Sequence, residues 1–203
     1  MLQGLERIGG ITVNQTVVIQ GAGPVGLAAT LIARFSGARE IIVVGAPKRR
    51  LEMARQFGAT ATINLDEVKS ARDRLEQVRM LTEGRGAELV IEAAGALPAF
   101  SEGIQFAAKS GRYLIVGLWS APGTAQVEPR YLNNMNLRIN GTAIFASRHL
   151  YGAIQIARKY HREFPMEAAV THRFPLSQAQ AALDAVSRLE TVKAVITPAV
   201  SAL

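Results

Sequence analysis

Short apolar runs rich in branched side chains alternate along the chain with longer segments whose apolar residues recur at helical spacing. The expected strands are Val17–Gln20, Ile41–Val44, Ala61–Asn64, Glu88–Glu92, Arg112–Val116, Leu137–Ile139, Val170–His172 and Ala194–Ile196. The expected helices are Val25–Ser36, Arg50–Phe57, Asp66–Thr82, Pro98–Ala108, Ser147–His161 and Gln178–Arg188. This alternation predicts an α/β fold, a single domain built on a doubly wound parallel sheet.

Local signals refine several boundaries of these elements. Met1–Ile11 has the spacing of a helix end that Gly9 and Gly10 stop. The polarity of Asp66–Thr82 is typical of an outer helix. Ser177 with Gln180 forms a capping-box pattern, which predicts where the last helix begins. Ser120–Pro129 has no periodicity, and we expect a loop there.

Composition limits the class of protein. The chain has 203 residues, 49% hydrophobic and 19% charged, which is typical of a globular domain with a core. Its apolar runs are too short to cross a bilayer, so we expect a soluble protein without a membrane partner. There are no cysteines, which excludes disulfides and thiolate metal sites and fits a cytoplasmic location.

The net charge of +7 leaves two interpretations open, an ordinary basic surface and an affinity for anions. The basic residues are spread over the chain, and the only tight run is Lys48–Arg50. Three residues are too short for a nucleic-acid-binding arm, so we expect no nucleic-acid partner. The anion, if there is one, is expected to be a phosphorylated cofactor.

The stretch Thr16–Gly26 reads TVVIQGAGPVG, an apolar strand followed at once by a glycine turn. Gly21, Gly23 and Gly26 form G-x-G-x-x-G, the fingerprint of a dinucleotide-binding βαβ unit. In that unit the first glycine permits the tight turn, the second lets the backbone approach a pyrophosphate, and the third lets the helix pack against the sheet. The alternative is a glycine turn that serves packing alone.

Pro24 suits the first helical position, because its fixed φ and missing N–H cost nothing there. Free N–H groups at the helix start, with Val25 and Gly26 as the expected donors, would then point at the phosphates.

Small residues also follow three later strands, where this fold places ligand contacts. They leave room for adenosine and nicotinamide, or they are ordinary turn residues. These candidate cofactor residues are Gly45, Ala46, Ala93, Ala94, Gly95, Val116, Gly117 and Leu118.

Gly45 stands where an NAD-binding unit usually carries an acidic residue for the ribose hydroxyls. Without a carboxylate there, nothing repels a 2′-phosphate, and Lys48, Arg49 and Arg50 follow within reach. The sequence therefore favours NADP slightly over NAD. A solvated helix start is the competing interpretation of the three cations.

No catalytic constellation is evident. His149, His161 and His172 lack metal-ligand spacing, and no G-x-S-x-G motif is present. We therefore assign no catalytic residue and no metal ligand to this chain.

The motifs nevertheless extend well beyond the glycine turn. They read LERIGGI, VVIQGAGPVGL, LEMARQFGATATIN, GRGAELVIEAAG, GRYLIVG, LRINGTAIF and VKAVITP in chain order. With these motifs the chain resembles the zinc-dependent alcohol dehydrogenases of the medium-chain dehydrogenase/reductase superfamily.

The resemblance covers only the cofactor-binding (Rossmann) domain of such enzymes. It implies that residues 1–15 are the remnant of an inter-domain helix, residues 16–197 the dinucleotide-binding domain, and residues 198–203 a tail towards a catalytic domain. In the family that other domain carries the catalytic zinc, which polarises the oxygen of an alcohol or carbonyl substrate while hydride passes to or from the nicotinamide. We therefore expect a truncated dehydrogenase fragment that is inactive alone.

The resemblance also adds site residues. It implies that Ala143–Phe145, with Ala143 and Phe145 as the assigned residues, lines the cofactor path and that Lys193 lies near the pyrophosphate. NADP-using relatives with glycine at the place of Gly45 carry Ser and Arg soon after, where this chain has Ala46 and Pro47. The family pairs subunits edge to edge, which makes Ile139–Phe145 the expected dimer edge.

Two other functions remain open. One is a zinc-free quinone or enoyl reductase of the same superfamily, and the other is a stand-alone nucleotide-binding module.

Overall fold

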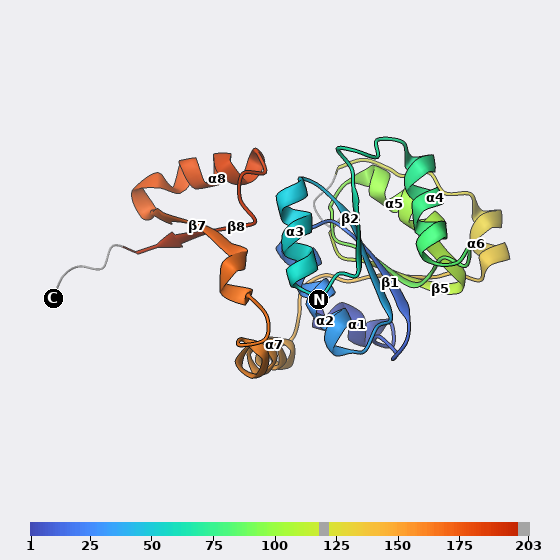
Figure 1. The fold of residues 1–203 in the computed structure, drawn as a ribbon, viewed down its shortest axis with the longest axis horizontal. Helices are drawn as coiled ribbons and strands as arrows, with labels where there is room; N and C mark the ends of the chain where they lie inside the picture. Colours follow the sequence, from blue (N-terminus) through green and yellow to red (C-terminus); the bar gives the residue numbers. More distant parts are fainter. Residues whose placement is uncertain (118–121, 199–203) are drawn as a thin grey trace.

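The computed structural model describes residues 1–117 and 122–198, and its largest feature is a sheet of six parallel strands (Figure 1). The strands are β1 (Thr16–Gln20), β2 (Glu40–Gly45), β3 (Ala61–Asn64), β4 (Ala87–Glu92), β5 (Ala107–Ile115) and β6 (Arg138–Gly141). Their spatial order is β3-β2-β1-β4-β5-β6, and every neighbouring pair is parallel. The predicted doubly wound α/β architecture is confirmed.

Helices cover both faces of this sheet, and Figure 1 shows the two helix layers on its opposite sides. One layer holds α1 (Leu2–Arg7), α2 (Pro24–Phe35) and α3 (Lys48–Gln56), whose apolar side chains share a core with Val17 and Ile19. The other holds α4 (Ala71–Leu81), α5 (Leu97–Phe106) and α6 (Pro129–Met135), which pack with Val18 and its neighbours. Successive residues of β1 thus serve opposite cores, as a strand period of two requires.

The last two predicted strands are confirmed as strands, but they pair with each other in a separate parallel sheet. This C-terminal part, seen beside the six-stranded sheet in Figure 1, holds α7 (Ser147–Tyr160), η2 (Met166–Ala169), β7 (Val170–Pro175), η3 (Leu176–Gln178), α8 (Ala179–Ser187) and β8 (Lys193–Thr197). Aromatic contacts join it to α2. The Phe35 ring stacks on Tyr160 with centroids 3.8 Å apart and meets the edge of Phe164 at 5.1 Å.

Several predicted helix boundaries differ from those in the structure. The helix expected over Asp66–Thr82 begins only at Ala71, because the Ser70 hydroxyl accepts the Asp73 N–H and caps the helix there. The predicted Ser177–Gln180 capping box does not form. Ser177 lies in the 3₁₀ turn η3, and the residue at the N-cap of α8 makes no side-chain cap hydrogen bond.

The sequence also misplaced the beginning of β5 and missed α6. The helix expected over Pro98–Ala108 ends at Phe106, because Ala107 pairs with Ala87 and already belongs to the strand. The loop predicted over Ser120–Pro129 is confirmed for residues 122–128, which form neither helix nor strand. None of the described helices is long and apolar enough to cross a bilayer.

Arg112 fastens the first fifteen residues to the sheet. It lies on β5 with 6% of its surface exposed, and its guanidinium donates to the carbonyls of Ile8 and Gly10, each at 2.7 Å, and to Gln15 Oε1 at 2.8 Å. Burial, and to a lesser extent the charge of Arg138, lowers the pKa of this guanidinium. Carbonyl oxygens thus take the place of an acidic partner.

Replacing Arg112 with Met should lower the free energy of unfolding by about 2–3 kcal/mol, because two backbone carbonyls lose their charged donor. Urea denaturation would measure the change. Arg138→Met is the matched control, since Arg138 lies opposite Arg112 on β6 and is exposed. It should change the free energy by less than about 0.5 kcal/mol. Equal effects of the two variants would contradict this role of Arg112.

Candidate functional site

The glycine turn after β1 is closed by backbone contacts that exclude other residues. Gly21 has φ +104° and donates its N–H to the Val44 carbonyl at 2.7 Å. A Cβ on Gly21 would lie 2.7 Å from the Ala93 carbonyl oxygen, and one on Gly26 would lie 1.8 Å from the Gly21 oxygen. Helix α2 can therefore sit directly on the turn only with glycine at both positions.

Gly23 differs from the other two glycines. It is the N-cap of α2 with φ −83° and ψ −176°, a backbone conformation open to any residue, and a Cβ there would meet no atom within 4 Å. Pro24 occupies the first helical turn, and the exposed Val25 follows. Gly23 has no side chain to cap the helix, so the first N–H groups of α2 have no side-chain cap, as binding of a phosphate requires.

The sheet order brings the ends of β2, β1, β4 and β5 to one edge, with their candidate residues. A Cβ on Gly45 would lie 3.0 Å from the Ala22 nitrogen, so β2 ends against the glycine turn. A Cβ on Gly117 would lie 2.6 Å from the Gly95 nitrogen. The loops after β4 and β5 therefore touch through their backbones. Leu118, also predicted to line this site, lies outside the described residues.

Glu92, which the sequence analysis did not single out, lies beneath these two loops. It is the last residue of β4, and none of its surface is exposed. Its Oε1 accepts the N–H groups of Ala94 at 2.8 Å and Gly95 at 2.6 Å, and its Oε2 accepts that of Gly117 at 3.0 Å. The available signal was an acidic residue at the end of an apolar strand, directly before Ala-Ala-Gly.

The three cations after β2 do not share one environment. Lys48 is exposed and makes no hydrogen bond or ion pair within the described part of the chain. Arg49 donates to the Leu189 carbonyl, and the buried Arg50 donates to the Thr191 carbonyl through Nε at 3.1 Å and through a second nitrogen. Burial, with a smaller effect of the charge on Arg49, lowers the pKa of the Arg50 guanidinium. Both arginines therefore bind the segment before β8.

The residues assigned by resemblance lie outside the loops that follow β1, β2, β4 and β5. Ala143 and Phe145 follow β6 and are exposed, Phe145 to 58%. Lys193 begins β8 and is also exposed. No hydrogen bond among the described residues connects Lys193 with the glycine turn, although Thr191, two residues earlier, accepts a hydrogen bond from Arg50.

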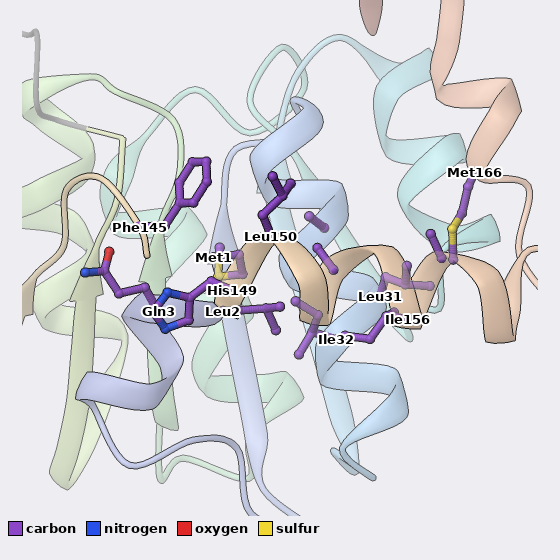
Figure 2. A pocket seen from close by; sticks show the side chains of 13 residues that line it. Met1, Leu2, Gln3, Leu31, Ile32, Phe145, His149, Leu150, Ile156 and Met166 are labelled. Carbon is purple, nitrogen blue, oxygen red and sulfur yellow. The ribbon is translucent and has the colours of Figure 1, made fainter. Parts of the chain in front are cut away.

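Phe145 borders an apolar cavity of about 320 Å³ between α1, α2 and α7 (Figure 2). The walls are Met1, Leu2, Gln3, Ala28, Leu31, Ile32, Phe145, His149, Leu150, Ala153, Ile156, Ala157 and Met166. Of the predicted cofactor residues that the structure describes, only Phe145 is among them. These mostly apolar side chains offer few hydrogen-bond donors to a pyrophosphate. None of them belongs to the turn at Gly21–Gly26, so this cavity is distinct from the open space at Gly23.

His149 closes one end of this cavity with both ring nitrogens engaged. Nδ1 accepts the Ala146 N–H at 3.0 Å, which assigns the proton to Nε2, 2.5 Å from a Glu6 carboxylate oxygen. This hydrogen bond, followed by that from Arg148, lowers the pKa of Glu6. His149 thus joins α7 to α1.

Among residues 1–117 and 122–198, no three His, Cys, Asp or Glu side chains are grouped so that they could hold a metal ion. The described side chains therefore offer no zinc site, and the resemblance places the zinc ligands in the other domain.

Comparison with known proteins agrees with this geometry. A family model described as "Zinc-binding dehydrogenase" matches residues 24–159. The 5-exo-hydroxycamphor dehydrogenase of Pseudomonas putida is 45% identical over 97% of this chain and 54% of its own length. The erythritol/L-threitol dehydrogenase of Mycolicibacterium smegmatis is 31% identical over 98% of this chain and 52% of its own.

A solved alcohol dehydrogenase from Thermotoga maritima superposes with a TM-score of 0.87 at 30% identity, covering 96% of this chain and 53% of that one. The chain thus spans about half the length of the curated relatives it matches. Since the family model covers more than half of the chain, the chain belongs to the zinc-binding dehydrogenase family, of which it represents the cofactor-binding half.

Proposed function

We propose that this chain binds NAD(P)(H) at the carboxyl edge of its six-stranded sheet. The observation that carries the proposal is the turn at Gly21–Gly26, where two glycines are required by packing and the third, Gly23, faces open space at a helix start. The N–H groups of Val25 and Gly26 would bind the pyrophosphate. Gly45 and Ala46 would face the adenosine ribose, and the loops after β4 and β5 would hold the other half of the dinucleotide.

We further propose that the bound cofactor serves an alcohol or polyol dehydrogenase. The two curated relatives described above are named for the oxidation of an alcohol or a polyol. When bound, the nicotinamide supplies a hydride acceptor or donor. This chain would hold and orient the cofactor, and a metal would require ligands from outside the described residues. Turnover of an alcohol panel by these 203 residues with added zinc would contradict that division of roles.

We also propose that two copies of the chain pair through β6. This strand is the last of its sheet, and a sheet edge offers unpaired N–H and C=O groups to another strand. The Thr142 N–H points inward to the Ile115 carbonyl. Successive N–H groups along a strand point to opposite sides, so those of Ile139 and Gly141 point away from β5.

Replacing Gly23 with Ala should weaken binding of both dinucleotides at least about tenfold, or about 1.4 kcal/mol, because the new methyl group occupies the space of the pyrophosphate. Isothermal titration calorimetry would measure the dissociation constants. Gly152→Ala on α7 is the matched control, since its Cβ would make only an ordinary contact of 3.5 Å with Leu2. Unchanged binding by the Gly23 variant would overturn the site itself.

The unmodified chain should bind NADPH at least as tightly as NADH, because Gly45 offers no carboxylate and Lys48 is unengaged in the described part of the structure. Lys48→Met should then weaken NADPH and leave NADH unchanged. Lys69→Met, at an exposed lysine before α4, should alter neither affinity. Direct titration of both cofactors checks this preference, which a tenfold tighter binding of NADH would refute.

Sedimentation velocity should show a dimer that Gly141→Pro converts to a monomer, because proline removes an outward N–H. Gly141→Ala keeps that N–H and should stay dimeric. The alanine side chain meets no obstacle, since a Cβ at Gly141 has no neighbour within 4 Å. A monomeric unmodified chain, or a dimeric proline variant, would show that β6 is not the contact.

A further inference from the structure

Glu92 is a buried acid that the proposed cofactor contacts leave unexplained. Its side chain is fully buried, and no Lys, Arg or His in the described residues forms an ion pair with it. Burying a carboxylate without a cation is costly unless hydrogen bonds replace its water. Here the N–H groups of Ala94, Gly95 and Gly117 do so, at 2.6–3.0 Å.

These hydrogen bonds tie two loops that are otherwise far apart in the sequence. The first loop follows β4 and holds Ala94 and Gly95, and the second follows β5 and holds Gly117. The Glu92 backbone takes part as well, since its carbonyl accepts the N–H groups of Val116 at 2.9 Å and Gly117 at 3.1 Å. Glu92 therefore fixes where the peptide groups of both loops lie. The two loops can touch because Gly95 and Gly117 have no side chains.

The sheet order indicates which half of the cofactor would meet these loops. In a doubly wound fold the pyrophosphate lies at the helix start after β1, and the adenosine ribose lies at the end of the next strand in sequence, here β2. Strand β2 flanks β1 on one side, and β4 with β5 lies on the other. The nicotinamide half would then rest on the loops that Glu92 holds.

We propose that Glu92 is a positioning residue for the nicotinamide half of the dinucleotide. It fixes the peptide groups of both loops in the arrangement that receives the nicotinamide ribose and ring, and it leaves the adenosine half to the turn at Gly21–Gly26. This inference rests on the proposed cofactor-binding function. A purely structural acid would instead affect both halves of the cofactor equally, or neither.

The same strand offers a matched control for this role. Glu88 lies at the opposite end of β4, where its Oε2 accepts the Thr16 N–H at 2.8 Å. Glu88→Gln and Glu92→Gln each replace a carboxylate of β4 that accepts a hydrogen bond from at least one backbone N–H group. In Glu92→Gln one of the two terminal oxygens becomes an NH₂ group, which cannot accept an N–H hydrogen bond. Because both Glu92 oxygens accept such bonds from the loops of the site, only this variant places an NH₂ group against those loops.

The test compares two ligands on each variant. One is the reduced dinucleotide that binds the unmodified chain more tightly, and the other is its ADP-ribose portion, with the 2′-phosphate if that dinucleotide is NADPH. Glu92→Gln should weaken the dinucleotide at least about tenfold, or about 1.4 kcal/mol, and the ADP-ribose ligand less than about twofold. Glu88→Gln should alter neither affinity, whatever it does to stability.

Gly117→Ala provides a second approach to the same loops, because its Cβ would press on the Gly95 nitrogen from a distance of 2.6 Å. It should reproduce the selective loss and thus covers the case in which Glu92→Gln does not fold. Equal weakening of both ligands, or unchanged binding of the dinucleotide, would overturn the inference. An unmodified chain that binds neither ligand would overturn the proposed function itself, which separates the two failures.

Discussion

The close approach of backbone to backbone at the end of β1 is the constraint on which the rest of the structure depends. Gly26 sits so near the Gly21 carbonyl that even a methyl group would overlap it, and a methyl group on Gly21 would lie 2.7 Å from the Ala93 carbonyl oxygen. Because α2 begins directly on the turn, its apolar residues Leu27 and Leu31 are buried against the sheet. The same turn places Gly23 at the N-cap of α2, where no side chain caps the helix and a Cβ would meet open space.

The loops after β4 and β5 follow the same principle with one addition. Their backbones touch at Gly95 and Gly117, and the buried carboxylate of Glu92 receives the N–H groups that this contact would otherwise leave without partners. The resulting edge of the sheet presents peptide groups and small side chains. That composition suits the holding of a large polar ligand.

The sequence predicted what depends on local patterns. Branched runs marked the strands, their alternation with helices gave the doubly wound sheet, and three glycines marked the turn. It missed features that arise from distant contacts. Helix α6 is short and depends on the partial burial of Tyr131 and Leu132 against the second core. β5 extends back to Ala107 because Ala87 offers a partner there, although alanine itself favours helix.

The three cations after β2 show the same limit at the candidate site. Their spacing suggested a joint phosphate site, but a sequence pattern cannot reveal that Arg50 is buried against the Thr191 carbonyl, 141 residues away. That hydrogen bond makes α3 a bridge between the end of β2 and the segment leading into β8. A 2′-phosphate at Gly45 could therefore bind Lys48, which makes no hydrogen bond or ion pair among the described residues. For Arg49 and Arg50 it would have to compete with backbone carbonyls. Under the proposed cofactor site, a preference for NADP would therefore rest on Lys48 unless the C-terminal segment released these two arginines.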